Sequence, residues 1–215
     1  MSVFAGSDLG CVRGERPVFR HLSFSVESGS ALTLTGANGA GKSSLLRLMA
    51  GLLPAAAGRL TWDGGDVAAD PEAHRGRIAW IGAGDAVKPN LTVLENARFW
   101  AEVAGGRRGA AAAALDRFGL DRFGLAGLAD TPARFLSQGQ RRRLALSRLL
   151  AVRRPVWLLD EPTVGLDAGA VAGFEAVLAE HCRDGGLAVL ATHVPIATPG
   201  ARVLVLRRTT EAAAC

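Results

Sequence analysis

A glycine-rich stretch from Gly36 to Ser43 has the residue types and the spacing of a phosphate-binding loop. Its small residues allow several backbone N–H groups to turn toward one anion, and the start of a following helix adds partial positive charge. We expect Lys42 to reach the β- and γ-phosphates of a nucleotide and the Ser43 hydroxyl to bind Mg²⁺. The predicted nucleotide-binding residues are Gly36, Ala37, Asn38, Gly39, Ala40, Gly41, Lys42, Ser43 and Ser44.

The residues around this loop fit the prediction. Residues 31–35 form a short apolar run that predicts a buried strand entering the loop, and residues 44–51 carry a helical apolar face leaving it. Lys42 is one of only two lysines among 25 basic residues, which indicates that arginine cannot replace it. The sequence therefore predicts nucleotide binding.

A pair of acidic residues, Asp160 and Glu161, follows the apolar run 155–159. Because neighbouring side chains of a strand point in different directions, we assign the two carboxylates different roles. Asp160 is expected to hold Mg²⁺ together with Ser43, and Glu161 to polarise the water that attacks a phosphoanhydride.

A second candidate anion site begins at Leu136. The run Leu136-Ser137-Gln138-Gly139-Gln140 places a hydroxyl, a glycine and unpaired N–H groups at the start of a predicted helix. The chain thus carries two predicted phosphate-binding segments about 100 residues apart.

Composition narrows the class of protein. A chain of 215 residues, 49% of them hydrophobic, suits one sizeable globular domain. Although the net charge is +5, the arginines are scattered and there is no tyrosine, so we do not expect a nucleic-acid partner. The three cysteines are far apart, which argues against a disulfide framework or a zinc site and favours a reducing cytoplasm. No apolar window approaches 18 residues, so a membrane role requires a partner chain.

The order of predicted elements indicates an α/β protein. Residues 22–26 predict a strand of a small antiparallel lobe, residues 59–62 a strand followed by a tight turn, and residues 77–81 a further strand. A helical lobe is expected at about 85–150; in it, Thr92 and Glu95 form a capping box and residues 110–128 are rich in alanine. Strands are then expected at 155–159, 187–191 and 203–206, with Asp167 capping a helix that runs to about Cys182.

Taken together, these motifs resemble the nucleotide-binding domain of the ABC ATPases. Five segments correspond: Gly36–Ser43 to Walker A, Leu136–Gln140 to the signature motif with Gln138 where glycine is commoner, Leu158–Thr163 to Walker B, Gly165–Asp167 to the D-loop, and Ala191–His193 to the switch histidine. The resemblance implies one ABC ATPase domain over residues 1–215. Its fold would be a P-loop NTPase core sheet with an N-terminal antiparallel β lobe and an inserted helical subdomain.

The same resemblance implies how the site works. ATP and Mg²⁺ are the implied cofactors, Glu161 and His193 the catalytic residues, with His193 near the γ-phosphate, and Asp167 the D-loop residue. Two copies would associate head to tail, so that Ser137, Gly139 and Gln140 of one copy complete the site of the other.

Two family features are missing. Ala83-Gly84-Asp85 stands where the Q-loop glutamine belongs, and Asp85 is the candidate substitute. The aromatic residue that stacks on adenine is also absent, and Arg13 and Phe19 are alternative substitutes.

Within the family, the run from Lys88 to Trp100 and the segment Thr192–Pro195 resemble the haem-exporter ATPases of bacterial cytochrome c maturation. This implies an ATP-hydrolysing subunit for haem export or release, peripheral on the cytoplasmic side of the inner membrane and bound to integral membrane ABC subunits. Haem would contact only those partners. The alternatives are the ATPase of another exporter or a soluble ABC ATPase. We expect Lys88 at the surface and Phe99 and Trp100 in the core.

Overall fold

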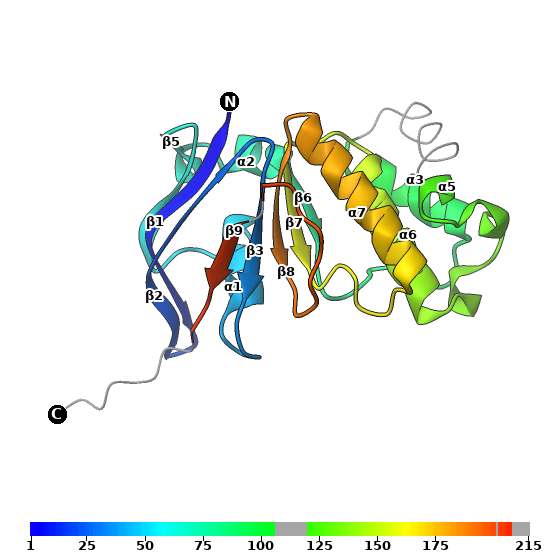
Figure 1. The fold of residues 1–215 in the computed structure, drawn as a ribbon, viewed down its shortest axis with the longest axis horizontal. Coiled ribbons are helices and arrows are strands. Elements are labelled where there is room, and N and C mark those ends of the chain that lie inside the picture. Colours follow the sequence, from blue (N-terminus) through cyan, green and yellow to red (C-terminus); the bar gives the residue numbers. More distant parts are fainter. Residues whose placement is uncertain (106–119, 201, 208–215) are drawn as a thin grey trace.

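The computed structural model describes residues 1–105, 120–200 and 202–207. Its described part contains an antiparallel sheet, a parallel sheet and a group of helices (Figure 1). This is the α/β class that the sequence predicts, with the expected P-loop NTPase sheet and antiparallel lobe.

The antiparallel sheet has the strand order β2-β1-β4-β5. Its strands are β1 (Val3–Arg13), β2 (Arg16–Glu27), β4 (Ala57–Trp62) and β5 (Gly65–Asp66). The sequence did not reveal β1, because register shifts on both sides of Leu9 interrupt its alternation. Asp8 within this irregular stretch has a positive φ of 51°.

The parallel sheet has the strand order β6-β7-β8-β3-β9. Its strands are β3 (Ala31–Thr35), β6 (Ile78–Ile81), β7 (Val156–Asp160), β8 (Leu187–Ala191) and β9 (Arg202–Val205). Strands β7 and β8 are buried at every position, as their unbroken apolar sequences require. The carboxyl ends of parallel strands meet at one edge, which is where open α/β sheets bind ligands.

Hydrophobic clusters cover both faces of the parallel sheet. Val156 and Leu158 of β7 pack with α1 (Lys42–Met49) and the antiparallel sheet, whereas Trp157 and Leu159 pack with α7 (Ala168–Arg183). Figure 1 shows α1 between the two sheets and α7 on the other side of the parallel sheet. Helix α2 (Pro71–Arg77) follows the short helix η1 (Val67–Ala69) and leads into β6.

Between β6 and β7, every element among the described residues is helical. These elements are α3 (Val93–Val103), α5 (Leu120–Arg122), η3 (Ala126–Leu128), η4 (Ala133–Phe135), α6 (Gln138–Ser147) and η5 (Arg148–Leu150). Thr92 and Glu95 form the predicted capping box at the start of α3. Much of the predicted alanine-rich helix of residues 110–128 lies outside the described residues.

The expectation that Phe99 and Trp100 lie in the core is wrong. Phe99 is 37% exposed and Trp100 is only partly buried, and their rings contact each other edge to face. The residues of α3 that are fully buried are instead Val93, Asn96, Ala97 and Ala101. Lys88 is exposed, as predicted, and its ammonium lies 5.4 Å from the centroid of the Phe99 ring.

Candidate nucleotide site

A cavity of about 380 Å³ lies at the carboxyl edge of the parallel sheet. Its size falls within the range of ligand pockets in proteins. Nine predicted site residues that come from three separate parts of the sequence line it together: Asn38, Gly39, Gly41, Lys42, Ser43, Ser44, Asp160, Glu161 and His193. The other residues of its wall are Val18 and Ala83.

The glycine-rich loop depends on backbone conformations that disfavour side chains. Gly36, Gly39 and Gly41 have φ values of 135°, 79° and 101°. A Cβ atom on Gly36 would lie 2.2 Å from the carbonyl oxygen of Leu206, so only glycine fits there. Gly41 precedes α1 without any side-chain cap, so the first N–H groups of α1 remain available to an anion.

Lys42 lies over this loop and is 7% exposed. Its Nζ atom donates hydrogen bonds to the carbonyl oxygens of Gly36, at 2.7 Å, and Ala37, at 3.3 Å. The ammonium group is therefore held beside the N–H groups that the loop presents, where it can meet phosphate oxygens.

The two predicted carboxylates have different surroundings. Asp160 ends β7 and is 3% exposed, whereas Glu161 begins the following loop with a φ of +49°. The Glu161 N–H donates to the carbonyl oxygen of Ala191 at 2.8 Å, which ties it to the end of β8. Its Oε1 atom lies 3.3 Å from Nε2 of His193, so the two predicted catalytic side chains are in contact.

The donor atoms at the site suit Mg²⁺ that arrives with a phosphate ligand. Ser43 and Asp160 line the same cavity and supply a hydroxyl and a carboxylate oxygen. Proteins commonly bind Mg²⁺ through one or two carboxylates, with phosphates and water as the other ligands. Among the described residues, no cluster of three or more His, Cys, Asp or Glu side chains forms a metal cage.

The signature residues lie away from this cavity, at the start of α6. Ser137 Oγ accepts a hydrogen bond from the N–H of Gln140, and Gln140 Oε1 accepts one from the N–H of Ser137. This capping box leaves Ser137 exposed. A Cβ atom on Gly139 would lie 2.6 Å from the carbonyl oxygen of Gly165, so α6 approaches the D-loop too closely for a side chain there.

The predicted D-loop residue Asp167 caps a helix. Its Oδ1 atom accepts a hydrogen bond from the N–H of Ala170 at 2.8 Å, which fixes the start of α7 as the sequence predicts.

Of the two proposed substitutes for the adenine-stacking aromatic, Phe19 is wrong, because it is 4% exposed and belongs to the core. Arg13 is exposed near the end of β1, outside the cavity wall, and its role stays a prediction. Neighbouring side chains of a strand alternate between faces, so β2 buries Phe19 and presents Val18 to the cavity. Asp85 also lies outside the wall, where it accepts a hydrogen bond from Arg142.

Sequence reasoning missed Arg142. This side chain is 3% exposed and contacts the backbone of Asp160 and Glu161. Helical spacing was the available signal, because Arg142 lies three and four residues before the buried Ala145 and Leu146.

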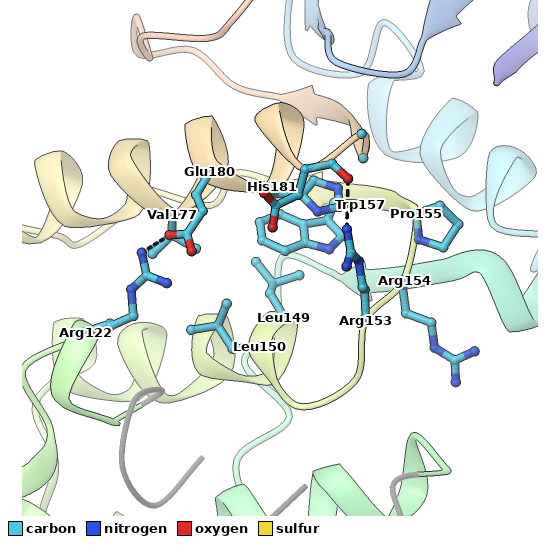
Figure 2. A pocket seen from close by; sticks show the side chains of 13 residues that line it. Arg122, Leu149, Leu150, Arg153, Arg154, Pro155, Trp157, Val177, Glu180 and His181 are labelled. Carbon is cyan, nitrogen blue, oxygen red and sulfur yellow. Dashed lines mark hydrogen bonds and ion pairs between the residues drawn. The ribbon is translucent and has the colours of Figure 1, made fainter. Parts of the chain in front are cut away.

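A larger cavity, of about 540 Å³, lies between α7 and the helical region (Figure 2). Arg122 pairs with Glu180 in its wall, and Arg153 donates a hydrogen bond to the carbonyl oxygen of Asp184. The rings of Trp157 and His181 stack 3.8 Å apart, and burial lowers the pKa of His181 to about 4. None of the predicted site residues lines this cavity, whereas nine of them line the smaller one.

Comparison with known proteins agrees with this geometry. The sequence pattern of the ABC transporter family matches residues 19–164. The chain belongs to this ABC transporter family. As an ABC ATPase it is 54% identical, over 95% of its own length and 86% of the relative's, to the cytochrome c biogenesis ATP-binding export protein CcmA of Rhodospirillum rubrum. The corresponding protein of Paramagnetospirillum magneticum is 53% identical over 95% of this chain and 94% of that one.

Solved structures of ABC ATPases share the fold. An ATP-binding subunit of an ABC transporter matches with a TM-score of 0.80 and 26% identity, over 89% of this chain and 80% of that one. A putative ABC transporter ATP-binding protein from Pyrococcus furiosus matches with a TM-score of 0.79, over 95% of this chain and 97% of that one; at 20% identity it supports the fold alone. Within the described part of this ABC ATPase, no helix is both long and apolar enough to cross a bilayer.

Proposed function

We propose that this chain hydrolyses Mg²⁺-bound ATP as the ATP-binding subunit of a membrane ABC complex for haem export or release in c-type cytochrome biogenesis. The observation that carries the proposal is the 54% identity, over 95% of the chain, to a cytochrome c biogenesis ATP-binding export protein. The cavity supports it, because the side chains needed for phosphoryl chemistry line one wall.

Each side chain has a role in this proposal. Lys42 and the loop N–H groups bind the phosphates, while Ser43 and Asp160 hold Mg²⁺, which neutralises phosphate charge when bound. Glu161 orients the attacking water and accepts its proton. His193 lies beside Glu161 at 3.3 Å and contacts the γ-phosphate.

The proposal includes a second copy of the chain. Ser137, Gly139 and Gln140 lie outside their own chain's cavity, so they are free to complete the site of a partner placed head to tail, with Asp167 nearby at the D-loop. We take residues 1–215 as one ABC ATPase domain, with residues 85–150 as its helical subdomain. Integral membrane subunits hold it at the cytoplasmic face of the inner membrane, and only they contact haem.

Deletion of the gene in a host that makes c-type cytochromes tests this function. Covalent haem staining should disappear and return with the wild-type chain, but not with the Glu161→Gln variant. Full staining after deletion would contradict the assignment. The chain should also co-purify with small integral membrane subunits and a covalent haem-binding protein, and recovery with a drug or lipid permease would favour another exporter.

A further inference from the structure

Arg142 is a buried arginine at the centre of α6, the helix that begins at the signature serine. Its guanidinium makes five hydrogen bonds of 2.7–3.1 Å. The acceptors are the carbonyl oxygens of Gly82, Asp160, Glu161 and Pro162 and the Oδ1 atom of Asp85. All five N–H donors of an arginine can be satisfied in this arrangement.

These acceptors come from two separate segments at the edge of the parallel sheet. Asp160 ends β7 and is the predicted Mg²⁺ ligand, and the predicted catalytic residue Glu161 and then Pro162 follow it, whereas Gly82 and Asp85 follow β6. Four acceptors are backbone atoms, so Arg142 fixes the course of the chain and leaves the Asp160 and Glu161 side chains free for chemistry.

The backbone of Glu161 needs such support. A glutamate with a φ of +49° has a strained backbone, and such a left-handed conformation is kept only where surrounding contacts hold the residue in place. Glu161 is held on both sides: its N–H donates to Ala191, and its carbonyl oxygen accepts from Arg142 at 2.8 Å.

We propose that Arg142 is a positioning residue for ATP hydrolysis, and that Asp85 is its counter-ion. Arg142 holds the Glu161 backbone so that the carboxylate faces the cavity, and Asp85 holds the guanidinium in place. This inference rests on the proposed role of Glu161 as the group that activates water.

The positive charges around Arg142 explain why position 85 carries an acidic residue. Arg148 begins η5, directly after α6, and burial together with the charge of Arg142 lowers the pKa of Arg148 to about 10. Asp85 is the carboxylate that opposes both cations, and its side chain is 23% exposed. Asp85 therefore balances buried positive charge at the position where the family carries a neutral glutamine.

Arg142→Lys in the full-length chain tests the proposal. Lysine keeps the charge but has three N–H donors and cannot satisfy five acceptors. Since a misplacement of about 1 Å can lower a rate ~100-fold, we expect kcat to fall ~10- to 100-fold. The affinity for Mg²⁺-bound ATP should stay within about twofold, because Arg142 makes no contact with the glycine-rich loop.

Arg143→Lys is the matched control, because this neighbour on α6 donates to the Phe123 carbonyl oxygen on the side away from the cavity. It should retain wild-type turnover. Asp85→Asn keeps an acceptor but removes the charge, and we expect about a fivefold fall in kcat because charge-assisted hydrogen bonds are about twice as strong as neutral ones. If Arg142→Lys does not fold, Asp85→Asn tests the proposal instead: a lower kcat with unchanged ATP affinity would support it, and an unchanged kcat or a parallel loss of ATP affinity would overturn it.

Adding Arg142→Lys to Glu161→Gln separates positioning from a general structural effect. An arginine that acts through Glu161 should change the residual turnover of Glu161→Gln by less than about twofold. A further ~10-fold loss in that background would overturn the proposal, as would unchanged kcat in Arg142→Lys or a parallel loss of ATP affinity. If the wild-type chain neither binds nor hydrolyses ATP, the proposed function itself fails, which is a distinct result.

Discussion

Replacing Glu161 with glutamine should stop turnover and leave the rest of the site intact. Glutamine has the shape of glutamate and keeps an acceptor oxygen facing His193, and both backbone hydrogen bonds of Glu161 remain. The exchange alters a contact between side chains that are 47% and 23% exposed, and even a full ion pair at such exposure contributes about 0.2–1 kcal/mol. The free energy of unfolding should therefore change by less than about 1 kcal/mol.

The expected effect on chemistry is much larger. General base catalysis contributes about 10²- to 10⁴-fold, which corresponds to roughly 3–5 kcal/mol in the activation barrier. Phosphate release at saturating Mg²⁺-bound ATP should fall by that factor, while equilibrium binding of a fluorescent ATP analogue stays unchanged. Light scattering should then detect a dimer in the presence of ATP, because bound nucleotide is no longer consumed.

Glu175→Gln on α7 is the control for losing one carboxylate. Glu175 accepts a hydrogen bond from the N–H of Ala197 and lies outside the cavity wall, so this variant should keep wild-type turnover. If Glu161→Gln hydrolyses ATP within about tenfold of the wild type, Glu161 is not the general base and the assignment of the two carboxylates is wrong.

Two further predictions concern stability. Gly36→Ala should lower the free energy of unfolding by about 1–3 kcal/mol, since the new Cβ atom would lie 2.2 Å from the Leu206 carbonyl oxygen; an unchanged thermal midpoint would contradict the close approach. The free energy of unfolding should also fall as the pH is lowered from 6.5 to 4, because burial lowers the pKa of His181 to about 4 and the unfolded chain therefore binds a proton that the folded chain does not. The loss should reach up to about 3 kcal/mol, and denaturant titrations should show a smaller loss in His181→Gln. Part of the loss that remains in this variant should come from His74, whose pKa is also lowered by burial.

The sequence predicts features that depend on neighbouring residues. Strand β8 is apolar throughout because both of its faces are buried, so its bounds could be recognised directly. The capping box of α3 and the helix cap at Asp167 each involve residues only three apart. Nine of the residues that line the cavity could be named in advance because phosphate chemistry requires particular residue types at particular spacings, whereas Val18 and Ala83 could not.

Features that depend on distant residues were missed. The acceptors of Arg142 lie 18–60 residues away along the chain, so the neighbouring sequence could indicate that Arg142 is buried but not which groups it contacts. Phe99 and Trp100 were expected in the core because large apolar side chains are usually buried, but a fully buried position of α3 is taken by the polar Asn96. Hydrogen bonds to the backbone of Lys88, Leu91 and Thr92 satisfy its amide, and residue type alone does not predict such contacts.

The most direct test of the central claim is an equilibrium titration of the purified chain with a fluorescent ATP analogue and Mg²⁺. We expect saturable binding that unlabelled ATP competes away. It should weaken ~10- to 150-fold in Lys42→Ala, because hydrogen bonds from a charged group contribute about 1.5–3 kcal/mol each. Absence of binding at millimolar nucleotide, or equal binding by Lys42→Ala, would contradict the claim that this loop holds a triphosphate.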